Sequence, residues 1–519
     1  MINALTQANL PFDSALAGAT RSPLTCRILI LADLGLIKEN LVVFSTQHHT
    51  TFSDWLAQQQ PIINVNLPSL GWLQLKISHL NDLHPTQLLK FIFQHLPNIS
   101  TEKMAAEAEF QQLKNNKLAM ALVNQLLYDP KIRQLEATWR SIDRLMRKAA
   151  ENAMTEIVLL HQSHEELHYN LNATQLIDSA LFQKIYAEEL GQYGGQPYSL
   201  ILVDNAWRNN QQDLNDLSAL AQLGQAAHAP VLTGVDPSLF DLDAFTQSVS
   251  AEQALELANS KRFIKLRELM QQPASRYLSL VLPRVLIRPP YELEMPQGLF
   301  KEQTPQGKNA LLWGNPCYSL ASLVLHSFQN YGGYTAMLNS PGDEDPLLPP
   351  YQLNAHTPPL PPLEARWPQA TLAAFARQGF TLAGVGKNNT IAFEQPVSLH
   401  LGAKFNQQLQ PDYQLPYLLT LSRVAHYLKR VLREQLGSSD TLNSLETQLN
   451  QWLQNSVSAQ EKPSTEVMHR KPFRAAQLII TNKESLQPEI HLQLTPHLRH
   501  QGQSFTLNLT SSLTGGMHG

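Results

Sequence analysis

The feature that most constrains the fold is an alternation of short apolar runs with helical patterns from residue 155 to about residue 345. The runs EIVLL, YSLILVD and APVLTGV are continuously apolar, which is typical of strands that are covered on both faces. Between the last two runs, DLNDLSALAQLGQAAH has the period of an amphipathic helix. Strands that alternate with helices in this way predict an α/β layer.

The segments before and after this layer have other sequence patterns, which indicates a chain of several domains. We expect the α/β and α+β classes, with mixed sheets flanked by helices. The strand-like run TCRILILADL opens a compact α+β module, and Asp129 with Pro130 begins an amphipathic helix. Eight prolines between residues 341 and 367 predict an extended connector. The predicted divisions are a flexible arm (1–22), the α+β module (23–100), a helical connector (101–150), the α/β core (151–340), a Pro-rich loop (341–368), C-terminal helices and strands (369–512) and a tail (513–519).

Composition excludes some classes of function. Charged residues make up 16 % of the 519 residues and the net charge is -4, so there is no electrostatic case for binding nucleic acid. The two cysteines, Cys26 and Cys317, lie in apolar segments, which predicts buried thiols in a reducing compartment. No apolar run is long enough to span a bilayer, and the N-terminus lacks the pattern of a signal peptide. We therefore expect a soluble, cytoplasmic protein without an integral membrane segment.

The segment HQSHEELHYN contains His164, Glu165 and His168 at the H-E-x-x-H spacing. In the middle of a helix this spacing brings two imidazoles to one face to bind zinc, and the glutamate can deprotonate the bound water. Here the motif directly follows the strand-like run EIVLL, and Ser163 with Glu166 forms a capping box. We interpret the motif as the start of a helix, and a zinc-dependent hydrolase is the alternative.

No other catalytic pattern stands out. Glu188 or Glu189 could supply the third ligand of a zinc site with His164 and His168, by spacing alone. The chain has no G-x-S-x-G elbow, no phosphate-binding loop and no C-x-x-C. We therefore expect a protein that is not an enzyme and that holds no metal or cofactor.

Two C-terminal features are candidates for contacts with other proteins. The amphipathic helix YLLTLSRVAHYLKRVLREQLG carries a basic row opposite its apolar face, which is either a solvated face or a contact with an acidic partner. Three alternating strands end the chain, and such strands either close their own sheet or lend an edge to a neighbour. The candidate residues are Arg423, His426, Arg430 and Arg433 in the basic row, and Leu478, Ile480, Ile490, Leu492, Phe505 and Leu507 in inter-subunit strands.

Seven stretches between residues 115 and 512 resemble, in the same order, the large subunit of the type VI secretion contractile sheath (TssC, or VipB). The first five are LEATWRSIDRL, YAEELGQYGGQPYSLILVDNAW, AAHAPVLTGVDPSLF, RYLSLVLPRVLIRPPY and LLWGNPCYSLASLVLHSF. The sixth stretch is the helix pair SRVAHYLKRVLREQLGS and LETQLNQWL, and the seventh is the strand pair KPFRAAQLIIT and HLQLTPHL. The chain departs from the family at Gly333, where the family has an aromatic residue, and at Thr495, where the family has arginine.

Residues 25–98 resemble the small sheath subunit (TssB, or VipA) in ILILADLG, FSDWLAQQQPIINVNLP and LKISHLNDLHPTQLL. The resemblance therefore implies that the two subunit types are fused in one chain. The small subunit's C-terminal half and the large subunit's leading segment are missing or heavily shortened. In the family that leading segment carries a helix recognised by the AAA+ unfoldase that recycles contracted sheath, so recognition by this ATPase stays open.

The resemblance implies a structural protein whose copies stack as a helical sheath around an inner tube of Hcp-type hexamers. Contraction of the sheath propels the tube, and baseplate proteins are further expected partners. The basic row would then face the inner tube or a neighbouring subunit, and the arm and terminal strands would link neighbours. The alternative within the same machine is a sheath-like component of the baseplate or end that does not polymerise.

Overall fold

The computed structural model describes residues 25–36, 41–45, 51–95, 105–256, 260–295, 298–303, 307–337, 350–352, 359–386, 389–393, 395–400, 414–435, 442–481, 489–497 and 507–512. The predicted arm (1–22), the predicted tail (513–519) and Phe505 lie outside these residues.

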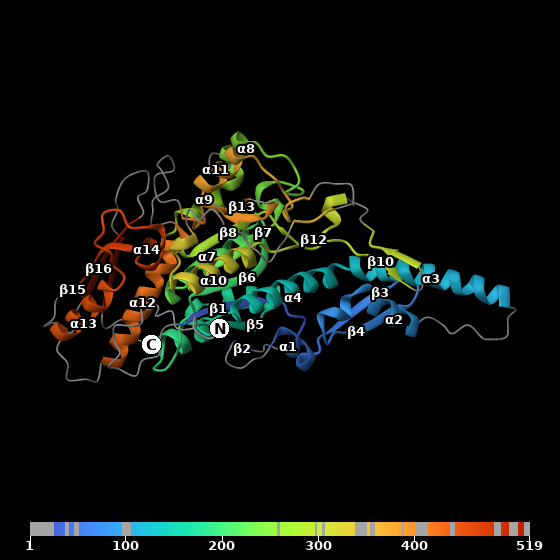
Figure 1. The fold of residues 1–519 in the computed structure, drawn as a ribbon, viewed down its shortest axis with the longest axis horizontal. Helices are drawn as coiled ribbons and strands as arrows, with labels where there is room; N and C mark the ends of the chain where they lie inside the picture. The colour runs from blue at the N-terminus through green and yellow to red at the C-terminus, as the bar shows by residue number, and fades with distance from the viewer. Residues whose placement is uncertain are drawn as a thin grey trace.

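An eight-stranded mixed sheet lies at the centre of the molecule, in the order β14-β13-β8-β7-β6-β1-β5-β2 (Figure 1). The strands from β13 to β5 are parallel, whereas the edge strands β14 and β2 are antiparallel to their neighbours. The three apolar runs predicted to be strands are β5, β6 and β7, which are mostly buried because helices cover both faces. The strands are β1 (Cys26–Ala32), β2 (Leu41–Ser45), β5 (Thr155–His161), β6 (Leu200–Trp207), β7 (Val231–Val235), β8 (Leu278–Leu282), β13 (Phe380–Val385) and β14 (Ile391–Phe393).

Strand β1 lies inside this sheet, which contradicts the expected separation of a 23–100 module from the α/β core. It pairs in parallel with β5 on one side and with β6 on the other. Ile28 and Ile30 contribute to the hydrophobic core on one face of the sheet, and Leu29 and Leu31 contribute to the core on the other face. Residues 23–100 are therefore not an independent unit, because their first strand is internal to the sheet of the α/β core.

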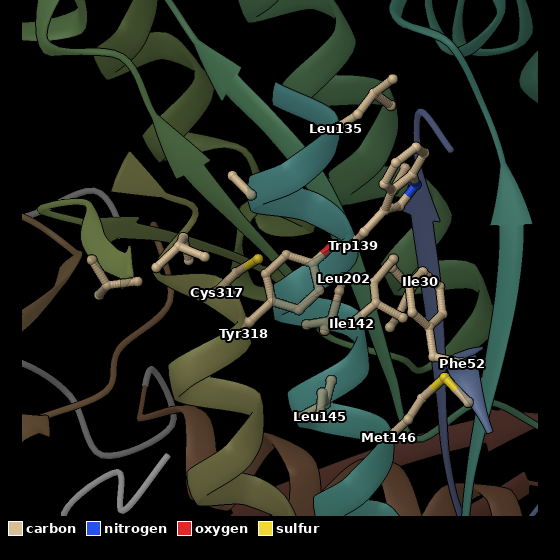
Figure 2. Close-up of a cluster of buried hydrophobic side chains, with 14 of the residues drawn as sticks. Ile30, Phe52, Leu135, Trp139, Ile142, Leu145, Met146, Leu202, Cys317 and Tyr318 are labelled. Atoms are coloured by element: carbon tan, nitrogen blue, oxygen red, sulfur yellow. The ribbon is translucent and has the colours of Figure 1, made fainter. Parts of the chain in front are cut away.

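Helices α1 to α4 and α10 share a hydrophobic core with one face of the sheet. The N-cap Asp129 accepts hydrogen bonds from the backbone N–H groups at the start of α4, as predicted. Trp139 and Ile142 of α4 are buried in this core together with Leu202 of β6 and Tyr318 of α10 (Figure 2). The helices are α1 (Phe52–Gln59), α2 (Pro85–His95), α3 (Ala105–Tyr128), α4 (Pro130–Ala149) and α10 (Cys317–Tyr331).

Helices α5 to α9 and α11 cover the other face, where alternate residues of the same strands are buried. Helix α6 continues into a π-helical segment, Gln183–Gly191. The helices are α5 (His164–Leu171), α6 (Ala180–Phe182), α7 (Gln211–Ala227), α8 (Ala251–Glu256), α9 (Ile264–Gln271) and α11 (Gln369–Arg377).

Small two-stranded sheets lie outside the central sheet. The hairpins β3–β4 and β10–β11 lie near α3 at one end of the molecule (Figure 1). The third pair joins β9 to β12. The strands are β3 (Ile62–Leu67), β4 (Gly71–Lys76), β9 (Val285–Arg288), β10 (Glu292–Met295), β11 (Gly298–Lys301) and β12 (Leu312–Gly314).

A C-terminal layer occupies the opposite end of the molecule (Figure 1). It consists of an antiparallel sheet in the order β15-β16-β17 whose inner face packs on α12 and α13. The ring of Tyr427 in α12 stacks on Trp452 in α13 with centroids 3.9 Å apart. The elements are α12 (Leu415–Gln435), α13 (Leu442–Gln454), α14 (Thr465–Arg470), β15 (Phe473–Thr481), β16 (Glu489–Pro496) and β17 (Leu507–Ser512).

The predicted fold class is confirmed: a mixed sheet is flanked by helices, and a separate set of strands follows near the C-terminus. Within the described ranges, no helix is both long and apolar enough to cross a membrane.

Candidate interaction surfaces

The H-E-x-x-H segment is the capped first turn of α5, as predicted. The Ser163 Oγ accepts from the Glu166 N–H at 3.2 Å, and the Glu166 Oε2 accepts from the Ser163 N–H at 2.8 Å. His164 occupies the first helical position and is exposed. Both glutamates, Glu165 and Glu166, lie in the first turn, where the helix dipole favours negative charge.

The two histidines of the motif contact different partners rather than a common point. The His164 Nδ1 lies 2.9 Å from the amide nitrogen of Asn205. Asn205 lies near the end of β6, two residues beyond Val203, the last residue of β6 that pairs with β1. The His168 Nδ1 lies 2.9 Å from each carboxylate oxygen of Asp216, which is on α7 and only 1 % exposed. Among the residues that the structure describes, no three His, Cys, Asp or Glu side chains form a group that could hold a metal ion. The motif therefore attaches α5 to α7 and to the end of β6.

The expected exposed basic row on α12 is wrong for Arg423 and His426, because both are buried. Arg423 is 5 % exposed, and its guanidinium lies over the ring of Phe328 in α10, 4.9 Å from the centroid. His426 is 3 % exposed, and its Nε2 donates to the Ala227 C=O at the end of α7 at 2.8 Å. These two residues attach the C-terminal layer to the α/β body and are not available at the surface.

Helix α12 is covered on both sides, which explains the burial of its basic row. Its apolar residues, including Val424 and Leu428, pack against the C-terminal sheet. Its polar side faces the body, where burial lowers the pKa of Lys429 and the ammonium lies 5.7 Å from the ring centroid of Tyr186. Arg430 is half-buried, and the side chain of Arg433 lies outside the described residues.

A buried ion network, which the sequence analysis did not identify, joins α4 to β9. The Arg288 Nε donates to the Glu136 Oε1 at 2.7 Å, and the Arg288 Nη1 donates to the Glu302 Oε2 at 2.6 Å. Burial alone would raise the pKa of Glu136, but Arg288 and Arg140 hold it below its usual value. The amphipathic pattern of this helix does not single out Glu136, which is fully buried. The sequence feature that could have revealed this network is Arg288, a single charged residue at the end of an apolar run, because a buried charge requires a partner of opposite charge.

The three terminal strands close a sheet of their own within the chain. Four of the candidate inter-subunit residues are at most 3 % exposed and belong to the core beneath α12 and α13, so their side chains are not free for another subunit. Those residues are Leu478, Ile480, Ile490 and Leu492. Leu507 is the first residue of β17, which pairs with β16 from Leu494↔Leu507 to Glu489↔Ser512. A neighbour can therefore meet this sheet only through its backbone edges or its outer face.

Comparison with known proteins identifies the family. The EvpB/VC_A0108 tail sheath N-terminal domain (VipB) matches residues 114–390, and the EvpB/VC_A0108 tail sheath gpW/gp25-like domain matches residues 403–513. The type VI secretion system sheath protein TssC1 of Pseudomonas aeruginosa is 28 % identical over 422 residues, which cover 76 % of this chain and 83 % of that protein. A chain in the cryo-EM structure of the anti-feeding prophage baseplate aligns over 95 % of this chain and 93 % of that one, with 8 % identity and a TM-score of 0.39.

The matched domains include strands β5 to β8 and β13 of the central sheet and the whole C-terminal layer. The chain belongs to the EvpB/VC_A0108 (VipB) family of tail sheath proteins, which are structural proteins and not enzymes.

Proposed function

We propose that this chain is a structural subunit of a type VI secretion contractile sheath, which polymerises around an Hcp-like inner tube and contracts to propel it. The observation that carries the proposal is the match of tail sheath domains to residues 114–390 and 403–513, in the order in which they occur in the family. Self-assembly follows from membership of a sheath family. The inner tube, the baseplate proteins and the cytoplasmic location are expected from the sheath function.

We also propose that residues 25–98 take the structural role of the small sheath subunit. The family match begins at residue 114, yet β1 inserts between β5 and β6 of the matched region. Without residues 26–32, the central sheet would divide into two parts that share no hydrogen bonds. Covalent attachment of this strand to the matched region supports a fusion of the two subunit types.

Fewer of the predicted contact residues are available to partners than the sequence indicated. Arg430, which is half-buried, stays a candidate for contact with the inner tube or with a neighbour. Arg433, whose side chain lies outside the described residues, stays a candidate on the sequence pattern alone. The C-terminal sheet is the candidate for contact between copies, through a backbone edge.

Co-sedimentation with hexamers of an Hcp-like protein tests the proposed partner. The chain is expected to pellet with assembled tubes, and Arg430→Ser together with Arg433→Ser is expected to weaken this association while the circular dichroism spectrum stays unchanged. The matched control is Arg377→Ser, which removes a charge from the last turn of α11. Equal pelleting of all three proteins would contradict the assignment of the two arginines, and no pelleting of the wild type would contradict the tube as partner.

A further inference from the structure

Trp72 on the β3–β4 hairpin is exposed to solvent, whereas the other tryptophans of the chain are buried. The chain has seven tryptophans; Trp72 is 74 % exposed, and each of the others is at most 9 % exposed. Ile62 of the same hairpin is 45 % exposed. Tryptophan is enriched among the side chains that dominate the binding energy of protein interfaces, and neighbouring exposed apolar residues mark interaction sites.

The β3–β4 hairpin has one buried face and one exposed face, because its side chains alternate. Ile62 lies directly opposite Lys76, and Asn66 lies directly opposite Trp72. Residues that are directly opposite share one face and lie about 5 Å apart. The exposed face consists of Ile62, Asn64, Asn66, Trp72, Gln74 and Lys76. This outer face is therefore apolar and polar, with one positive charge.

The outer face of the β10–β11 hairpin is similar but carries a negative charge. Leu299 is 60 % exposed and lies directly opposite Glu294. The other two charges of this face, on Glu292 and Lys301, neutralise each other at 3.6 Å. Within the described ranges, neither Glu294 nor Lys76 of the first hairpin forms an ion pair. Each hairpin therefore pairs an exposed aliphatic side chain with one charge, and the two charges have opposite signs.

The two outer faces point away from helix α3, which packs against the inner sides of both hairpins. Strand β3 contacts α3, and the Met120 Cε of α3 lies 3.6 Å from the position that a Cβ on Gly298 would take. Gly298 pairs with Met295 on the inner face of β10–β11. The hairpins lie on opposite sides of α3 in Figure 1. A contact between the two outer faces therefore joins two different copies of the chain.

We propose that the outer face of β3–β4 in one copy packs on the outer face of β10–β11 in a second copy. Lys76 pairs with Glu294, and Ile62 packs against Leu299. Trp72 lies four residues from Lys76, about 13 Å along the strand, and is the large apolar anchor of the contact. Because the two faces differ, the contact is heterologous and repeats from copy to copy in one direction. This inference rests on the proposed sheath assembly and adds which surfaces of neighbouring copies meet.

Charge reversal tests the pairing, with assembly measured by sedimentation. Lys76→Glu is expected to raise the protein concentration needed for assembly roughly tenfold or more, because it sets two carboxylates against each other. Lys90→Glu makes the same change at an exposed lysine of α2 and is the matched control, which is expected to assemble like the wild type. Equal assembly of Lys76→Glu and wild type, with unchanged circular dichroism, would overturn the proposal.

Mixing two variants tests whether the contact joins different copies. Glu294→Lys alone is expected to assemble as poorly as Lys76→Glu, because it sets two ammonium groups against each other. In an equimolar mixture each altered face meets an opposite charge on the other variant, so assembly is expected to return. A mixture that assembles no better than its components would overturn the proposal.

Acrylamide quenching of tryptophan fluorescence follows the anchor directly, since Trp72 is the exposed tryptophan. The readily quenched component is expected in the unassembled wild type, to be absent in Trp72→Phe, and to disappear when the wild type assembles. A component that persists in the assembled protein would overturn the proposal. Association that depends on Lys76 without tube formation would contradict the sheath function alone, and tubes that form equally well in Lys76→Glu would contradict the hairpin contact alone. A wild type that does not associate at all would contradict both.

Discussion

Acidification is expected to weaken the attachment of the C-terminal layer to the α/β body through His426. This residue is buried and bonds the end of α7 through the Ala227 C=O. Burial lowers its pKa to about 4; the bond to Ala227 opposes this shift, and the charges of Lys429 and Arg423 add to it. At neutral pH the imidazole is therefore uncharged and serves as a hydrogen-bond donor.

The sign and size of the effect follow from the difference between the folded and unfolded pKa. Below pH 6.5 the unfolded histidine takes up a proton, whereas the folded one stays neutral until about pH 4. The unfolded state then binds more protons, so the free energy of unfolding falls as the pH falls through this window. A shift from 6.5 to about 4 corresponds to about 3 kcal/mol, at about 1.4 kcal/mol for each pKa unit.

Guanidinium chloride unfolding at pH 7 and pH 4 measures this term by difference. His426→Gln keeps an amide donor for Ala227 but does not titrate, so the wild type is expected to lose about 3 kcal/mol more than the variant between the two pH values. Burial also lowers the pKa of the neighbouring His228, to about 3, and Lys429 and His426 add to this shift. Because burial is the main cause, most of that loss is common to both proteins. His164→Gln changes an exposed histidine and is expected to follow the wild type. Equal losses in wild type and His426→Gln would refute the reasoning.

Other perturbations test the remaining interpretations. Arg288→Met should destabilise the chain by about 3–5 kcal/mol, because it leaves Glu136 and Glu302 buried without their shared cation; denaturant unfolding would show no such loss if the network were unimportant. Trp139→Ala should cost about 3–5 kcal/mol through the cavity left between α4 and the sheet, and a loss below about 1 kcal/mol would contradict the packing in Figure 2. His168→Ala should leave the metal content of the purified protein unchanged, and stoichiometric zinc lost in this variant would contradict the capping role.

Local signals predicted several elements correctly because they depend on neighbouring residues. Asp129 and Pro130 begin α4, and Ser163 with Glu166 caps α5, since both helix starts are determined by side chains within three residues of the backbone groups that they bond. The apolar runs of β5 and β7 likewise reveal burial on both faces without reference to distant parts of the chain.

Long-range features could not be predicted in this way. Strand β1 pairs with β5, whose residues lie 129 positions further along the chain, and no local pattern encodes that register. The basic row of α12 has the pattern of a solvated face, yet Arg423 and His426 are buried because a second layer covers that face. Asn450 of α13 and Leu478 of β15 are 28 positions apart, so their two hydrogen bonds become evident only once the helix is packed on the sheet.

Electron microscopy of the purified chain tests the central claim most directly. The sheath account predicts hollow tubes built from helically stacked copies, with a lumen that accommodates an Hcp-like tube when one is supplied. Discrete particles that stay unpolymerised at high concentration, with and without the tube protein, would contradict that account and favour a sheath-like component that does not polymerise.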